Sequence, residues 1–214
     1  MTYQNSLDDV EIQKIDKQDT HTKALIEYDQ EYAINRLKIV DMSMQKIVNG
    51  LFDESGISRK GFHIAGGVIA NLYHMTISEI NRRQYDVDIF FDTHQGGDFD
   101  AGTEEFRALY ERYAVEDNEQ YGILDGKSAH AYLYESGLHD IKRFQLIFAR
   151  KGKIKEDIVN SFDLLHCRAY YDCDDYAMKI TPSQLKAIHT KTLVASGDPI
   201  PSRVSKWKAR GFSY

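Results

Sequence analysis

Residues 61–91 read GFHIAGGVIANLYHMTISEINRRQYDVDIFF, and the spacing of the apolar residues changes twice within this stretch. The first five residues alternate as a short strand does and lead into a pair of glycines. Residues 68–82 then carry apolar side chains at helical spacing, and residues 85–91 alternate again. The stretch therefore predicts a strand, a glycine turn, a helix and a second strand.

The second of these strands carries two acidic side chains, Asp86 and Asp88, with one valine between them. Residues at i and i+2 of a strand point to the same face, and the strand rise places their side chains about 7 Å apart. At that separation two carboxylates can bind one hard cation, or two Mg²⁺ ions about 4 Å apart. The alternative is an ordinary solvated strand face, because Asp-x-Asp alone is a weak signal.

The two glycines, Gly66 and Gly67, stand where the first strand turns into the helix. Glycine lets backbone N–H groups approach a phosphate closely, and the partial positive charge of a helix N-terminus favours anions. The alternative is a plain tight turn between a strand and a helix. Together with the acid pair, the turn predicts a triphosphate site beside a metal site, which is the arrangement that phosphoryl transfer needs.

The segments HIAGGVIANLYHM (63–75) and YDVDIFF (85–91) resemble the nucleotidyltransferase superfamily related to DNA polymerase beta. That superfamily carries a Gly-Gly or Gly-Ser turn, a helix and then an Asp-x-Asp flanked by apolar residues. Later segments are similar to its variant in bacteriophages and large DNA viruses: SAHAYLYE, FQLIFAR, SFDLLHCRAYYD and SRVSKWKARGF. The resemblance covers about residues 60–214. It implies an α+β (α/β) fold with a small mixed β-sheet and helices packed on that sheet, and it leaves the N-terminal helical extension outside.

The resemblance also implies roles for individual residues. Gly66 and Gly67 become the turn that contacts the phosphates, and Asp86 and Asp88 become ligands of Mg²⁺ or Mn²⁺. A third carboxylate of the family binds the catalytic metal and helps to deprotonate the attacking hydroxyl. We assign it to Asp163, which opens a strand predicted over 163–171. Its rivals are Asp172, Asp174 and Asp175, and Asp163 can also be read as an exposed residue at a strand start.

Basic side chains are needed to hold the triphosphate and the leaving pyrophosphate. Arg82 and Arg83 lie just before the second strand, while Arg203, Lys206 and Arg210 fall at i, i+3 and i+7 of a predicted C-terminal helix. Guanidinium groups suit phosphate because they donate two parallel hydrogen bonds. The alternative is a solvated helix end that complements its own dipole. These five residues are the predicted nucleotide-binding cations.

The remaining sequence predicts elements around this centre. A long amphipathic helix is expected over 21–52, either continuous or bent near Asp41. Residues 92–103 form an acidic, glycine-rich loop. Helices are further expected at 104–114, 155–161 and after Pro182 and Pro201, and strands at 128–134, 144–149, 163–171 and 176–180. We divide the chain into a leader with a helical extension (1–57) and a nucleotidyltransferase-like domain (58–214).

Charge and hydropathy limit which classes of partner the protein can have. A net charge of −6 argues against a protein that coats duplex nucleic acid, although the last twelve residues hold four basic side chains and no acidic one. No window approaches 18 uninterrupted apolar residues, and the polar first residues do not form a signal peptide. The two cysteines, Cys167 and Cys173, do not suggest a disulfide framework. We therefore expect a cytoplasmic protein, in the host cytoplasm if a phage encodes it, with no membrane partner and an oligomeric state that the sequence leaves open.

Two functions are compatible with this sequence. The first is a Mg²⁺-dependent nucleotidyltransferase that transfers a nucleoside monophosphate from an NTP to an RNA 3′ end, a small molecule or a protein, with release of pyrophosphate. The second is a catalytically inactive protein of the same fold that binds a nucleotide or a host protein as a phage accessory factor. The intact acid pair favours the first.

Overall fold

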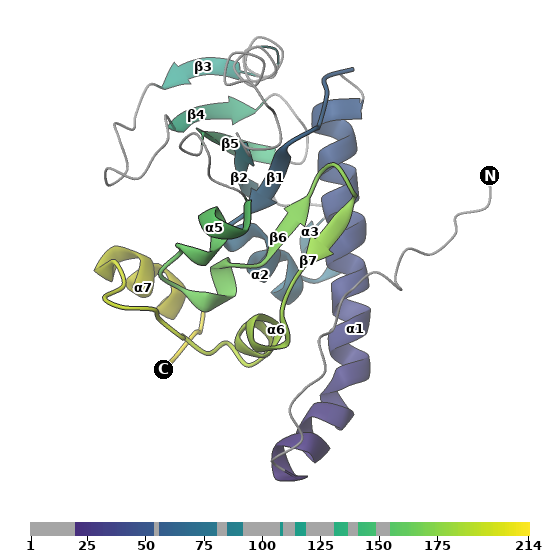
Figure 1. The fold of residues 1–214 in the computed structure, drawn as a ribbon, viewed down its shortest axis with the longest axis vertical. Coiled ribbons are helices and arrows are strands. Elements are labelled where there is room, and N and C mark those ends of the chain that lie inside the picture. Colours follow the sequence, from purple (N-terminus) through teal and green to yellow (C-terminus); the bar gives the residue numbers. More distant parts are fainter. Residues whose placement is uncertain are drawn as a thin grey trace, which may run out of the picture.

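The structure is a computed structural model that describes residues 20–53, 56–80, 85–91, 108, 114–118, 131–136, 141–148 and 155–214 (Figure 1). Its helices are α1 (Thr20–Val48, continued by a π-helical turn over Asn49–Asp53), α2 (Gly67–His74), α3 (Ile77–Ile80), α5 (Lys155–Asn160), α6 (Pro182–His189) and α7 (Pro201–Lys208). A 3₁₀ turn covers Leu165–Cys167. Its strands are β1 (Phe62–Ala65), β2 (Tyr85–Phe91), β3 (Ala114–Asn118), β4 (Ala131–Ser136), β5 (Ile141–Phe148), β6 (Tyr170–Asp172) and β7 (Ala177–Lys179).

The described strands form one mixed sheet in the order β3-β4-β5-β2-β1-β6-β7. Strands β2 and β5 are parallel, and every other neighbouring pair is antiparallel. Helices pack on this sheet, as the expected α+β class requires, so that class is confirmed. Strands β3, β4 and β5 extend the sheet beyond β2 on one side.

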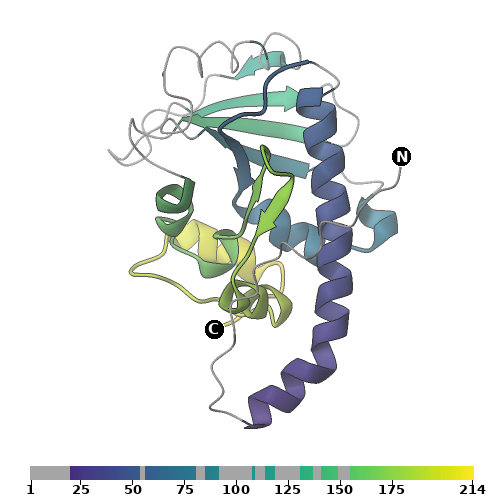
Figure 2. The same cartoon turned by 45° about the vertical axis from the view of Figure 1, so that its right-hand side comes forward.

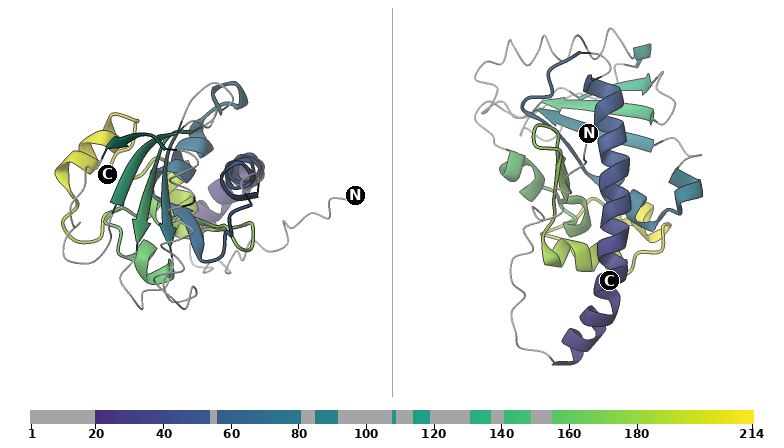
Figure 3. Two further views of the ribbon diagram at one scale, coloured as in Figure 1. Left: turned by 90° about the horizontal axis from the view of Figure 1, so that it is seen from above. Right: turned by 90° about the vertical axis from the view of Figure 1, so that its right-hand side faces the viewer.

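One face of the sheet lies against the main hydrophobic core. Val87 and Ile89 of β2 are fully buried there, together with Val40 and Met44 of α1 and Leu72 of α2. Figure 2 shows α1 running along this side of the molecule and past its end. In the view from above, α1 and α7 lie on opposite sides of the sheet (Figure 3). The long N-terminal helix therefore stabilises the face of β2 that does not carry the aspartates.

Helix α1 is continuous through Asp41, so of the two expected forms the structure contains the single helix. Its second half contributes to the same core as β1 and β2. The division of the chain at residues 57 and 58 stays a prediction. No helix in the described ranges is long and apolar enough to cross a membrane. The predicted loop at 92–103 lies outside the described residues, as does almost all of the helix predicted at 104–114.

The helix predicted over 68–82 is wrong in its length, because α2 ends at His74 and α3 begins at Ile77. Thr76 and Glu79 form a capping box between them: the Thr76 hydroxyl accepts from the Glu79 N–H at 3.2 Å, and the Glu79 carboxylate accepts from the Thr76 N–H at 2.9 Å. Arg36 of α1 donates to the carbonyls at the end of α2, including that of Tyr73 at 2.8 Å. These contacts satisfy the backbone groups of the break.

The strand predicted over 163–171 is also wrong. Residues Leu165–Cys167 form the 3₁₀ turn, and strand β6 begins only at Tyr170. The Arg168 guanidinium donates to the Phe162 carbonyl at 2.8 and 2.6 Å, which holds the chain in a compact bend instead of an extended strand. Asp163 consequently does not open a strand, and it lies outside the sheet.

Candidate metal and nucleotide site

Asp86 and Asp88 share the face of β2 opposite the core, with Asp86 exposed and Asp88 half-buried. Burial raises the pKa of Asp88 to about 6. The positive charges of Lys206 and Arg203 lower this pKa, whereas the neighbouring Asp86 charge raises it. The acid pair therefore lies where an added cation would stabilise the ionised form of Asp88.

Gly66 forms the bend between β1 and α2 directly beside Asp88. Its φ of 86° belongs to a region that side chains disfavour, and a Cβ added there would lie 2.7 Å from Oδ2 of Asp88. The register of β1 and β2 agrees with this close approach, because Ala65 pairs with Asp88. The Gly66 N–H donates to the Cys167 carbonyl at 3.2 Å. The amides that remain to meet a phosphate are therefore those of the first turn of α2, which starts at Gly67.

Gly67 is required for close packing with helix α7. A Cβ on Gly67 would lie 3.0 Å from Cζ2 of Trp207, which is itself buried. Trp207 also packs edge-on against the buried His166, with ring centroids 4.3 Å apart, and against Phe212 at 4.8 Å. This aromatic contact fixes α7 against the start of α2, so the C-terminal helix belongs to the site.

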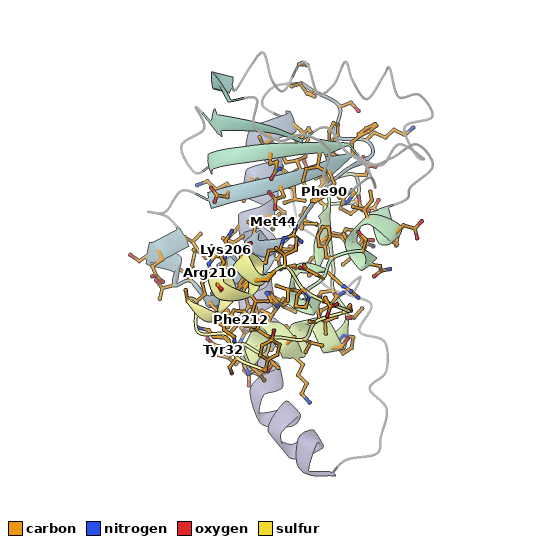
Figure 4. All side chains as sticks on the ribbon, turned by 90° about the vertical axis from the view of Figure 1, so that its left-hand side faces the viewer. Tyr32, Met44, Phe90, Lys206, Arg210 and Phe212 are labelled. Atoms are coloured by element: carbon orange, nitrogen blue, oxygen red, sulfur yellow. The ribbon has the colours of Figure 1, made fainter. Side chains whose placement is uncertain are left out.

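Helix α7 and the turn after it bring three predicted cations toward the aspartates. Figure 4 labels two of them, Lys206 and Arg210. Arg210 lies over the Trp207 ring at 4.8 Å and donates to Oδ1 of Asn71 in α2 at 2.9 Å. Burial lowers the pKa of Arg210, and the charge of Asp86 partly offsets that effect. Arg203 and Lys206 act electrostatically on Asp88, as described above. The structure thus gathers these three cations around the acid pair.

Asp163 contacts the α7 side of the site, and its predicted role as the third metal ligand stays a prediction. Its Oδ1 accepts from Nη1 of Arg203 at 3.1 Å, and its Oδ2 accepts from the N–H of Ile200 at 3.0 Å. Among the described residues, no group of three or more His, Cys, Asp or Glu side chains is placed to hold a metal ion. The position beside Asp88 on the neighbouring parallel strand is occupied by Gln145.

Arg82 and Arg83 lie outside the described residues, so their predicted contact with the nucleotide stays a prediction. Sequence reasoning missed Gln145, because only the pairing of β2 with β5 places it level with Asp88. It also gave no role to Trp207. The available signal was the position of Trp207 among the basic residues Arg203, Lys206 and Arg210 at the end of the chain.

The residues present fit a divalent cation. Mg²⁺ and Mn²⁺ bind through one or two carboxylates and complete their shell with water and substrate phosphate oxygens. Asp86 and Asp88 supply that donor set, and the glycine at position 66 leaves the Asp88 carboxylate open where a Cβ would collide with it. The first turn of α2 and the three cations of the α7 region are suited to the phosphate groups.

These features define an α+β protein whose central sheet carries a carboxylate pair between a glycine turn and a basic helix. The chain belongs to the Gabija anti-defense 2 (Gad2) family, whose sequence model matches residues 38–191. The matched range ends before α7. No curated protein matches the chain.

Thirteen chains of solved structures match this protein. One is the crystal structure of the Bacillus stearothermophilus CCA-adding enzyme in complex with CTP, with 12% sequence identity and a TM-score of 0.42. The match covers 80% of this chain and 40% of the enzyme, so the chain spans two fifths of the length of that protein.

Proposed function

We propose that this anti-defense family member is a Mg²⁺- or Mn²⁺-dependent nucleotidyltransferase of the DNA polymerase beta-like superfamily. It would transfer a nucleoside monophosphate from an NTP to an acceptor and release pyrophosphate. The proposal rests on the close contact between Gly66 and the Asp88 carboxylate. Helix α2 starts directly after this glycine, and the basic side chains of α7 face the same carboxylate.

In this proposal, an acceptor oxygen attacks the α-phosphorus of the NTP, and the bond from that phosphorus to the bridging oxygen of the β-phosphate breaks. The electron pair of that bond leaves with pyrophosphate. Divalent cations held by Asp86 and Asp88 would neutralise charge on the transferring phosphate and on pyrophosphate. Lys206, Arg203 and the first amides of α2 would bind the phosphate oxygens and orient the triphosphate in line with the acceptor.

The acceptor in this proposal is an RNA 3′ end, a small molecule or a protein side chain. Asp163 was predicted to deprotonate it, but its carboxylate already accepts two hydrogen bonds from the α7 side. The proton of the acceptor would therefore pass to water or to a substrate phosphate oxygen. This arrangement suits an acceptor whose hydroxyl needs orientation more than a strong protein base.

One observation supports a second candidate function. Where a third acid would complete the metal site, the described residues place Gln145 level with Asp88. An inactive protein of this fold could keep the nucleotide site and use the bound nucleotide, or the same surface, to engage a host protein of the Gabija defence. Such a binder would need the phosphate-binding residues but no chemistry.

The two candidates are separated by a label-transfer assay. The protein is incubated with each α-labelled NTP and Mg²⁺ or Mn²⁺, with RNA, small-molecule and protein acceptors, and pyrophosphate release and transferred label are measured. The transferase proposal predicts metal-dependent release that Asp88→Asn lowers by about a thousandfold or more. Asp175→Asn is the matched control, because Asp175 is an exposed aspartate in the turn between β6 and β7. That turn contacts Gly61 and Phe62 at the start of β1, whereas Asp88 pairs with Ala65 at its end, so Asp175 is no longer a rival for the third carboxylate.

Equal activity in wild type, Asp88→Asn and Asp175→Asn would remove the acid pair from the chemistry. If no acceptor yields activity but an NTP with Mg²⁺ still binds to the wild type and not to Asp88→Asn, the inactive nucleotide binder is the better description.

A further inference from the structure

Asp163 holds the start of helix α7 through three separate hydrogen bonds. Its two carboxylate oxygens accept from the Ile200 N–H at 3.0 Å and from the Arg203 guanidinium at 3.1 Å. Its backbone carbonyl accepts from the Ser196 N–H at 2.8 Å. Its side chain is only 16% exposed, whereas that of Arg203 is 47% exposed. The segment that leads into α7 is therefore attached at one acidic residue.

The attachment replaces a cap that α7 lacks. Ile200 is the N-cap residue of this helix and offers no side-chain acceptor, and Pro201 at the first position has no N–H. A carboxylate at this end also complements the positive end of the helix dipole. Asp163 thus supplies from another part of the chain the acidic group that the helix start does not contain.

Helix α7 contains side chains that act on the acid pair, so its position determines where these side chains lie. Arg203 lies in its first turn and is shared, since it pairs with Asp163 and also lowers the pKa of Asp88. Lys206 acts on Asp88 as well, and Trp207 packs on Gly67. A shift of the α7 start would displace Arg203 from the aspartates, while the contact of Trp207 with Gly67 fixes the other end of the helix, next to Lys206.

We infer that Asp163 is a positioning residue for the triphosphate: it orients Arg203 and the start of α7 toward the substrate phosphates, and it does not ligate the metal. The inference rests on the proposed function for the identity of the ligand. It assigns to Asp163 an effect on nucleotide affinity with little effect on metal affinity. Substitution of a metal ligand would instead lower metal affinity more than nucleotide affinity, because the lost charge contacts the cation directly.

Stability should change little in the variants that test this role. Arg203 is largely exposed, and ion pairs of that kind contribute little to the free energy of unfolding. Asp163→Asn keeps an oxygen that can accept from the Ile200 N–H but removes the charge that pairs with Arg203. Arg203→Ala removes the other partner. Both variants are expected to fold, and their far-UV circular dichroism and melting curves verify this.

The test measures two affinities for each variant of the full chain. Mn²⁺ affinity without nucleotide is followed by electron paramagnetic resonance. Affinity for non-hydrolysable analogues of each of the four NTPs, with Mg²⁺, is followed by calorimetry. Asp163→Asn is expected to lower nucleotide affinity about tenfold and to leave Mn²⁺ affinity within about twofold. Asp88→Asn should lose Mn²⁺ binding, and Asp175→Asn should match the wild type in both. The double variant Asp163→Asn/Arg203→Ala should bind nucleotide no more weakly than Arg203→Ala alone.

Loss of Mn²⁺ binding in Asp163→Asn to the same degree as in Asp88→Asn would overturn the inference, and so would additive losses in the double variant. If the wild type binds none of the four analogues, the proposed function fails by itself. The fluorescence of Trp207, the single tryptophan of the chain, then decides about Asp163. Asp163→Ala is expected to shift its emission to longer wavelength and to increase acrylamide quenching, and unchanged emission and quenching would contradict the positioning role.

Discussion

Strand β2 presents Val87 and Ile89 to one side of the sheet and Asp86 and Asp88 to the other. The first side is buried beneath α1 and α2, where apolar side chains gain free energy by leaving water. The second side contains a half-buried carboxylate whose pKa is raised to about 6 because burial disfavours its charge. The first side thus only stabilises the fold. The second side is mixed: Phe90 is buried there in a smaller apolar cluster, whereas the charge of Asp88 lowers stability and the acid pair provides the groups that can bind a metal and phosphates.

The largest stability effect should come from the apolar side. Ile89→Ala removes a fully buried side chain from the core and is expected to lower the free energy of unfolding by about 3 kcal/mol. Urea unfolding measures this loss. Asp88→Asn, one position away, is the control: at pH 7.5 it should leave stability unchanged or raise it, because it removes a disfavoured charge. A loss of stability in Asp88→Asn as large as that in Ile89→Ala would show that the two sides do not differ as described.

A nearly equal effect is expected from pH at His166, which lies under the site between Trp207 and Phe212. Burial lowers the pKa of His166 to about 4, with the Arg210 charge lowering it further and the Asp163 charge raising it. Below pH 6.5 the unfolded chain binds a proton at this histidine that the folded chain does not take up until about pH 4. Stability is therefore lost as pH falls through this window, by up to about 3 kcal/mol.

The variant His166→Phe isolates this contribution. Urea unfolding of both proteins at pH 7 and pH 4.5 should show a stability difference that moves in favour of the variant at the lower pH. If the difference in unfolding free energy between the two proteins were the same at both pH values, His166 would be protonated in the folded protein at pH 4.5, as it is in the unfolded chain.

A smaller effect is expected at the glycine beside the acid pair. Gly66→Ala combines a disfavoured φ with a Cβ placed 2.7 Å from the Asp88 carboxylate, and should lower stability by about 2 kcal/mol. Gly197→Ala is a matched control, because Gly197 has a φ of 71° but nothing within 4 Å of an added Cβ. Thermal unfolding compares them, and Mn²⁺ affinity should fall only in Gly66→Ala. Equal Mn²⁺ affinity in both variants would argue that the close approach of Gly66 to Asp88 is unimportant for the metal.

The smallest effect concerns Gln145, which lies level with Asp88 on β5. Gln145→Glu adds a third carboxylate to the polar side and is expected to strengthen Mn²⁺ binding about tenfold, since a charged oxygen replaces an amide near the ion. Gln145→Ala should alter Mn²⁺ affinity by less than about twofold. Titration by electron paramagnetic resonance measures both. No gain from Gln145→Glu would place Gln145 outside the reach of the metal.

The central part of the fold was predictable because its signals are local. The alternation of residues 85–91 and the glycine pair defined β2 and the turn at Gly66, and prolines marked the starts of α6 and α7. The break between α2 and α3 was missed although the capping box of Thr76 and Glu79 is a local signal of a helix start. The contacts of Arg36 with the carbonyls at the end of α2 could not be read from the sequence, because Arg36 lies in another helix. Long-range contacts of this kind leave no local pattern.

The same distinction applies to the site. Asp86 and Asp88 could be paired from their spacing alone, and the three cations of the α7 region from theirs. Asp163 was misplaced, because apolar residues after it suggested a strand where the Arg168 guanidinium stabilises a bend. The register of β5, which brings Gln145 beside Asp88, is a tertiary property and was not available from the sequence.

The most direct test of the central claim is ligand-linked stabilisation measured by thermal unfolding. Each NTP is added with Mg²⁺ to wild type, Asp86→Asn, Asp88→Asn and the control Asp175→Asn. If the acid pair holds a cation against a triphosphate, at least one NTP at about 100 times its Kd should stabilise wild type and the control by roughly 2.7 kcal/mol, raising Tm by several degrees. Asp86→Asn and Asp88→Asn should show no such rise, and neither should the wild type without Mg²⁺. Equal increases in all four proteins, or none in any of them, would contradict the account.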